Sequence, residues 1–317
     1  INMIDNTSKE FIGRHIGPSE EEIKKMLKVV GADSLDDLIK KTVPDNILLK
    51  DELKIGDPTS EHESLKQLKT ISEKNKVYTN YIGMGYSNTY MPNVILRNIY
   101  CNPGWYTAYT PYQPEVAQGR LEMLLNFQQM ILDFTGMDIA NASLLDEATA
   151  TAEAIGLSRR LDKNNLNKVF VSSDCNPQTI DVIKTRTEVF GLKLIIGDQE
   201  KDLKDIKGDI ICGILAYPGT LGDIRDPSEA ISVIHKKKGK AILVCDLLAL
   251  AKLKTPAELG ADIAVGSSQR FGIPMGYGGP HAAFFATKDE YKRAMPGRII
   301  GVSVDRLGKK ALRMALQ

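Results

Sequence analysis

The sequence predicts an α/β protein with a mostly parallel β-sheet that helices cover on both faces. Two observations support this prediction. First, the runs that favour strands are apolar throughout, whereas a strand with one face in solvent would alternate apolar and polar residues. Second, helical patterns separate these runs along the chain. Strands that are apolar on both sides need cover on both faces of the sheet, and intervening helices are typical of parallel connections.

The first 77 residues are predicted to form a helical arm. Ser19 followed by Glu22 is a capping box, and Gly31 supplies the stop of this first helix. Ser34 begins a second helix, which Pro44 ends. Because short amphipathic helices are unstable alone, we expect residues 1–77 to dock on the following domain or on another chain.

Residues 78–114 are rich in glycine, tyrosine, asparagine and proline. These residue types favour irregular backbone and bring hydroxyl and amide groups into loops. One interpretation is a functional surface, and the other is a loop that packs over the core. The composition leaves both open.

Helices and strands alternate further along residues 78–317, which we expect to form one large domain. One helix follows Pro114 and ends at Gly136, and a second runs from Asp146 to about residue 161. A third lies between Pro177 and Gly191, with proline just inside its start and glycine beyond its end. A fourth helix is expected at residues 228–235, and strands at 168–172, 192–196, 210–216, 241–245, 262–265 and 281–286.

Composition excludes several classes of partner. The 317 residues include 41 basic and 40 acidic side chains, for a formal net charge of +1, and no basic block stands out. We therefore expect neither nucleic-acid nor membrane binding. No apolar run approaches the roughly 20 residues that cross a bilayer, and the segment before Phe11 lacks the features of a secretory signal. A soluble, intracellular protein is the expectation.

Polar residues that follow the predicted strands are the candidate ligand contacts, because ligands of open parallel sheets bind beyond the carboxyl ends of the strands. Asp246 follows the strand at 241–245, and Ser-Ser-Gln-Arg at 267–270 follows the strand at 262–265. A glycine-rich turn spans residues 276–280. These signals are weak alone, since a strand-terminal aspartate often caps a helix and a glycine-rich turn is often only a turn.

The histidines and cysteines show no metal-ligand or disulfide spacing. We expect no metal site, and we expect the cysteines to be thiols, two of them inside buried strands. The residues concerned are His15, His62, His235, His281, Cys101, Cys175, Cys212 and Cys245.

Four long strings resemble the amino-terminal half of the P-protein family, glycine dehydrogenase (decarboxylating) of the glycine cleavage system. They are residues 11–18, 109–122, 140–147 and 266–280. Their unusual composition and shared order make the resemblance specific, and it extends over residues 11–317. It implies an aspartate-aminotransferase-like fold (type I of the pyridoxal-phosphate enzymes), whose large domain has a seven-stranded, mostly parallel sheet.

The family also implies two homologous halves, of which the carboxyl-terminal half holds pyridoxal phosphate through a lysine. In this sequence Gln269 stands at the position of that lysine, so this half has no catalytic residue of its own and binds no cofactor. Asp246 matches the aspartate that pairs with the cofactor ring and is interpreted as vestigial. Asp146 and Glu147 stand at the phosphate-binding turn, where two carboxylates suit the start of a helix and repel phosphate.

By resemblance, the intact enzyme decarboxylates glycine and passes the aminomethyl group to the lipoyl arm of H-protein. We expect this chain to complete the pocket of the carboxyl-terminal half through a polar loop. The candidate pocket and interface residues are Tyr106, Tyr109, Thr110, Tyr112, Gln113 and Glu115.

Two alternatives stay open. The chain is a purely structural scaffold for the catalytic half, or it is an independent pyridoxal enzyme that uses Lys252 or Lys254, which we expect to face solvent. The stop at Gln317 predicts a fragment without the small domain, inactive alone and prone to form dimers or other homo-oligomers. If Met3 is the native start, a bacterial cytoplasm is favoured, and a mitochondrial matrix is expected only for a eukaryotic source.

Overall fold

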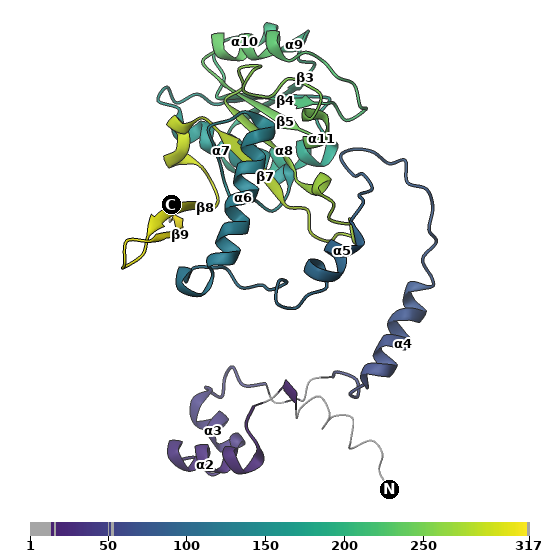
Figure 1. The fold of residues 1–317 in the computed structure, drawn as a ribbon, viewed down its shortest axis with the longest axis vertical. Coiled ribbons are helices and arrows are strands. Elements are labelled where there is room, and N and C mark those ends of the chain that lie inside the picture. The colour runs from purple at the N-terminus through teal and green to yellow at the C-terminus, as the bar shows by residue number, and fades with distance from the viewer. Residues whose placement is uncertain (1–13, 16, 50, 52–53, 316–317) are drawn as a thin grey trace. The chain divides into compact units, whose positions relative to one another are not determined.

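The computed structural model describes residues 14–15, 17–49, 51 and 54–315 (Figure 1). The start of the first resemblance string, Met3 and Gln317 lie outside these residues. The chain divides into two compact units, with the boundary between Thr79 and Asn80. Each unit is described by itself.

The first unit is helical. Ser19 caps its first helix as predicted, because the Ser19 N–H donates to Glu22 Oε2 at 2.7 Å and the Glu22 N–H donates to Ser19 Oγ at 3.4 Å. Gly31 ends this helix in the left-handed region at φ 73°, and Ser34 caps the next. The predicted ends are confirmed. The helices are α2 (Glu20–Val30), α3 (Leu35–Thr42) and α4 (Glu61–Ser72).

The second unit is built on a seven-stranded sheet in the order β1-β7-β6-β5-β4-β2-β3. The five strands from β3 at one edge to β6 pair in parallel, and β7 runs antiparallel to both of its neighbours. The predicted α/β class with a mostly parallel, seven-stranded sheet is confirmed. The strands are β1 (Ile139–Ala140), β2 (Lys168–Ser172), β3 (Lys193–Gly197), β4 (Cys212–Tyr217), β5 (Lys240–Cys245), β6 (Ile263–Ser267) and β7 (Ala283–Thr287).

Two apolar layers cover the sheet, and alternate residues of each strand point into opposite layers. In β5, Ile242 and Val244 join the layer under α7 and α8, whereas Leu243 and Cys245 join the layer under α6, α10 and α11. The central strands are therefore apolar throughout because both of their faces are buried. The helices are α6 (Gln118–Thr135), α7 (Glu147–Leu161), α8 (Pro177–Val189), α9 (Asp202–Asp205), α10 (Ser228–Lys236) and α11 (Leu247–Leu250).

The strand order creates a switch point. After β2 the chain crosses over through α8 to β3 at one edge, and after β4 it crosses through α10 to β5 on the other side. Adjacent connections that leave in opposite directions open a crevice beyond the carboxyl ends of the strands. The sheet thus positions the segments that follow β4, β5 and β6 around one place.

Several elements were not predicted, among them β1, α9 and α11 as well as a short helix and a hairpin. Residues 93–100 of the expected irregular segment form a short helix, α5 (Asn93–Ile95) continuing into η1 (Leu96–Tyr100), after Pro92 at the N-cap. A hairpin of β8 (Ile299–Val304) and β9 (Lys310–Ala315) follows the sheet. Little of this hairpin is buried: of its residues, only Ile300 and Met314 are. The remaining short helices are η2 (Pro114–Val116), η3 (Gln269–Phe271) and η4 (Asp289–Ala294).

Two glutamines of α6 hold this hairpin through its backbone. The Gln128 amide donates to the Ile300 carbonyl at 3.2 Å and accepts from the Ile300 N–H at 2.7 Å. Gln118 makes the same pair of bonds with Leu312, both at 2.9 Å. Because these side chains substitute for a neighbouring strand, the hairpin needs little apolar burial to stay attached.

Candidate functional site

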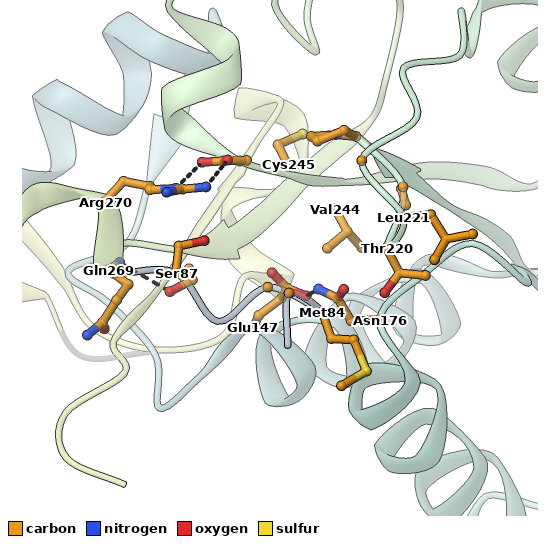
Figure 2. A pocket seen from close by; sticks show the side chains of 18 of the residues that line it. Met84, Ser87, Glu147, Asn176, Thr220, Leu221, Val244, Cys245, Gln269 and Arg270 are labelled. Atoms are coloured by element: carbon orange, nitrogen blue, oxygen red, sulfur yellow. Dashed lines mark hydrogen bonds and ion pairs between the residues drawn. The ribbon is translucent and has the colours of Figure 1, made fainter. Parts of the chain in front are cut away.

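A cavity of about 320 Å³ lies at the carboxyl-terminal edge of the sheet (Figure 2). Its walls come from the segments after β4, β5 and β6, from the start of α7 and from residues 83–89. The sequence singled out Asp246, Gln269 and Glu147, and all three line it. The polar lining side chains are Ser87, Thr89, Glu147, Asn176, Thr220, Asp246, Ser267, Gln269 and Arg270.

Gln269 opens η3 directly after β6, and its side chain is held in place. Its backbone N–H donates to Ser267 Oγ at 3.1 Å, and its side-chain amide donates to the carbonyl of Ile273. The residue is 7% exposed. An amide nitrogen is not nucleophilic, so Gln269 cannot form an imine with an aldehyde.

Asp246 follows β5 and caps α11, accepting the Leu248 N–H on Oδ1 at 3.0 Å. Arg270 also binds this carboxylate with both arms of its guanidinium, Nε to Oδ1 at 3.0 Å and Nη2 to Oδ2 at 2.8 Å. Figure 2 shows this bidentate pair in the cavity wall. Both oxygens of Asp246 are therefore engaged, and the pair adds no net charge to the cavity.

The two carboxylates at the start of α7 have different surroundings. Asp146 caps the helix, because its Oδ1 accepts the Thr149 N–H at 2.7 Å. Glu147 turns away from the helix start, and its Oε1 accepts from Asn176 Nδ2 at 2.9 Å and Thr179 Oγ1 at 3.1 Å. Burial raises the pKa of Glu147, and these two hydrogen bonds oppose the shift. Both carboxylates lie at the start of α7, as the sequence indicates, but only Asp146 caps the helix.

These residues do not fit pyridoxal phosphate. Gln269 offers an amide where the cofactor needs an amine, and Arg270 takes the Asp246 carboxylate that would pair with the pyridinium nitrogen. The Glu147 carboxylate lies at the first turn of α7, where a phosphate needs free N–H groups and positive charge. The amine, the ring contact and the phosphate contact are all missing here.

Residues 83–89 form one wall of this cavity. They belong to the segment for which the sequence left a functional surface open. Gln178 Nε2 donates to the Met84 carbonyl at 2.7 Å, and Thr89 Oγ1 donates to the Ile273 carbonyl at 3.1 Å. Gly85, at φ 85°, passes so close to Asn176 that a Cβ would lie 2.7 Å from its Nδ2. Gly85 thus serves both the close approach and the turn, whereas Gly83, at φ 66°, serves the turn alone.

A second cavity, of about 420 Å³, holds part of the predicted polar loop. Tyr109 and Thr110 line it, together with Ser143 and Arg298. It does not share a lining residue with the first cavity. The candidate residues therefore fall into two separate places within this half.

The rest of the polar loop contacts its own domain or faces solvent. Tyr112 accepts a hydrogen bond from Arg298 Nη2 at 2.5 Å, and the guanidinium also lies over the Tyr112 ring, 5.3 Å from its centroid. Tyr109 donates to Gln113 Oε1 at 3.0 Å. Tyr106 and Glu115 are exposed and line neither cavity. Arg298 had no signal in the sequence.

The lysines that were considered as alternative imine sites lie outside both cavities. Lys252 and Lys254 are exposed and line neither of them. Within the described ranges, no group of three or more His, Cys, Asp or Glu side chains could hold a metal ion. Cys101 is exposed, while Cys212 and Cys245 are buried thiols in β4 and β5. No helix in the described part of the chain is long and apolar enough to cross a membrane.

Known sequences resemble this chain over almost its whole length. Glycine dehydrogenase (decarboxylating) of Pelagibacter ubique is 75% identical over 99% of this chain and 33% of its own length. The protein of the same name from Teredinibacter turnerae is 56% identical over 98% of this chain and 32% of its own length. The chain thus spans about one third of the relatives it matches.

Solved structures agree with the sequence matches. The crystal structure of glycine decarboxylase (P-protein) of the glycine cleavage system, in inhibitor-bound form, matches at a TM-score of 0.88 and 34% identity, covering 96% of this chain and 69% of that chain. A sphingosine-1-phosphate lyase of Burkholderia pseudomallei shares the fold alone. It matches at a TM-score of 0.58 and 12% identity, covering 84% of this chain and 66% of that chain. The family described as Glycine cleavage system P-protein matches residues 13–317, and the chain belongs to this family.

Proposed function

We propose that this chain is the half of a glycine decarboxylase that does not bind pyridoxal phosphate, and that it pairs with a carboxyl-terminal half that does. The observation that carries the proposal is the cavity wall around Gln269. The lysine position holds a buried amide bonded to the Ile273 carbonyl, and Arg270 occupies the aspartate that the ring would need. The intact enzyme then decarboxylates glycine and passes the aminomethyl group to lipoylated H-protein.

The polar loop is the proposed contribution of this chain to the partner's pocket. Tyr109 and Thr110 line a cavity with hydroxyl groups at its rim, and Tyr106 and Glu115 are exposed. Exposed tyrosines bring apolar area and a hydrogen-bonding tip at low cost in conformational entropy, which suits an interface. The relatives named above are bacterial, which supports the proposed cytoplasmic location of the paired enzyme.

A second candidate function is a scaffold that only folds and stabilises the catalytic half. One observation favours it: Tyr112 is tied to Arg298, and Tyr109 to Gln113, within the same domain. Side chains that already form hydrogen bonds within their own domain are less available to bind a substrate in the partner's pocket. The scaffold proposal assigns these residues to stability alone.

Kinetics of a full-length enzyme that carries this chain separate the two candidates. We expect Tyr109→Phe and Gln113→Ala to lower the rate of glycine decarboxylation about tenfold, which corresponds to about 1.4 kcal/mol in the barrier. The unfolding midpoint should hardly move. Tyr277→Phe, an exposed tyrosine that lines neither cavity, is the matched control. Normal rates in all variants would contradict the loop's role, and lost stability at normal rates would favour the scaffold.

A further inference from the structure

The Glu147 carboxyl group has no charged partner in the described part of the chain. Its side chain projects into the cavity at the strand ends and forms no ion pair with a described Lys, Arg or His. The one cationic side chain of the cavity lining, Arg270, is already paired with Asp246. A buried carboxylate without a counter-charge is costly, so its retention needs a reason.

The geometry around Glu147 leaves one oxygen for a ligand. Asn176 and Thr179 both donate to Oε1, and Oε2 accepts no hydrogen bond from a described residue. The carboxylate is thus oriented by two fixed donors while its second oxygen stays free. Figure 2 shows Glu147 bonded to Asn176 on the side of the cavity that faces Met84.

A second polar atom in the same cavity also lacks a partner. Thr220, in the turn after β4, lines the cavity, and its Oγ1 is buried without a hydrogen bond. Figure 2 shows this hydroxyl on the side of Thr220 that faces Asn176. Unpartnered buried hydroxyls are uncommon in native proteins, and a bound water, ion or ligand is one explanation for them. The two atoms without a hydrogen-bond partner, one carboxylate oxygen and one hydroxyl oxygen, can both accept hydrogen bonds.

The remaining lining is apolar near these acceptors. Met84, Ala216 and Val244 contribute to the walls, and the cavity measures about 320 Å³. This is far more than the ≈ 30 Å³ share of one water molecule, so a bare monovalent ion would leave most of the space unfilled. Acceptors beside an apolar wall suit a cation that carries alkyl groups.

We propose that this cavity binds a small alkylammonium ion, which donates one N–H group to Glu147 Oε2 and packs its alkyl groups against Met84 and Val244. An ion that carries a second N–H group donates it to Thr220 Oγ1. The site uses residues of this chain alone, so it does not rest on the proposed pairing with a catalytic half. The ligand forms no covalent bond, because the carbonyl groups of the lining are amides, which do not condense with amines.

Trimethylammonium is the probe for this site, since a tertiary ammonium has one N–H donor and three methyl groups. We expect it to bind the full 317-residue chain in a calorimetric titration and to raise the unfolding midpoint as its concentration rises. tert-Butyl alcohol, which also has three methyl groups and one hydrogen-bond donor but no charge, should bind at least about tenfold more weakly, because a hydrogen bond to a charged group is worth about 1.5–3 kcal/mol.

Glu147→Gln keeps the acceptor for Asn176 and Thr179 and removes the charge. We expect its affinity for trimethylammonium to fall at least about tenfold. The control is Glu153→Gln on the same helix, whose carboxylate pairs with Arg186 and lies outside the cavity. That variant should bind as the unchanged chain does.

Several outcomes would overturn the proposal. Equal affinity of the Glu147→Gln variant, equal binding of tert-butyl alcohol, or no binding of trimethylammonium would each do so. Potassium or ammonium that raises the midpoint through Glu147 while trimethylammonium does not would assign the site to an inorganic ion instead. If Glu147→Gln fails to fold, the comparison of the charged and neutral probes on the unchanged chain decides.

Discussion

Two carboxylates at opposite ends of the same parallel strands have opposite surroundings. Asp262, just before β6, is 3% exposed and accepts from His235 Nε2 at 2.8 Å, Lys288 Nζ at 2.6 Å and the Ala241 N–H at 2.8 Å. Glu147, at the carboxyl ends, accepts only from two neutral donors. Asp262 is compensated at the amino-terminal edge, whereas Glu147 has no charged partner among the described residues at the carboxyl-terminal edge, where this fold class places ligands.

The pKa values follow this difference. Burial alone would raise the pKa of Asp262, but hydrogen bonds from His235 and Lys288 outweigh it and lower that pKa to about 2. For Glu147 burial is also the largest cause, and the hydrogen bonds of Asn176 and Thr179 are too weak to reverse it, so its pKa is raised. The comparison teaches that charged partners, more than depth, decide the state of a buried carboxylate.

The largest expected effect comes from removing the compensated charge. Asp262→Asn should lower the free energy of unfolding at pH 7 by about 2–3 kcal/mol, since each pKa unit is worth 1.36 kcal/mol. Denaturant unfolding measures it. Asp289→Asn, in an exposed ion pair with Lys292, is the matched control and should change little. A loss no larger than the control's would break the comparison.

The same carboxylate predicts a pH dependence. The pKa of Asp262 is lower in the folded chain than in the unfolded chain, so its stabilisation is present above the unfolded value of about 4 and is lost as pH falls from about 4 to about 2. Unfolding curves measured across this range should show a smaller pH slope in Asp262→Asn than in the unchanged chain. Equal slopes would show that other groups govern acid unfolding.

A smaller effect of opposite sign is expected at Glu147. Its raised pKa means that stability is highest below the unfolded value of about 4 and falls as pH rises through the folded value. Glu147→Gln should therefore stabilise the chain at neutral pH, by about 1 kcal/mol. Glu153→Gln, which loses an ion pair with Arg186 on the same helix, should not. Destabilisation by Glu147→Gln would show that its charge is compensated after all.

The smallest effect is expected for the intermediate case, the Asp246–Arg270 pair. Its side chains are 25% and 31% exposed, between the extremes of the comparison. Arg270→Gln should cost about 0.5 kcal/mol, and the cost should shrink as salt is added. Lys184→Gln, in the more exposed pair with Asp181, is the control and should show no measurable loss. A loss as large as that of Asp262→Asn would place this pair with the buried ones.

Local signals explain what the sequence predicted well. The capping box at Ser19, the glycine after α6 and the strand at 168–172 depend on neighbouring residues, and all lie where expected. Gln269 and Asp246 were located because strand ends converge in a parallel sheet. What was missed depends on distant contacts: Asn176 with Glu147, Arg298 with Tyr112, and the hairpin that α6 holds through glutamine side chains. No periodicity in the sequence encodes such pairs.

The central claim is that the strand-end cavity of this chain cannot hold pyridoxal phosphate. The direct measurement is to incubate the folded chain with the cofactor, reduce with borohydride and locate any pyridoxyl adduct by mass spectrometry. The account predicts no stoichiometric adduct, because Gln269 provides no amine and Lys252 and Lys254 lie outside the cavity. A stoichiometric adduct at one lysine of this chain would contradict it.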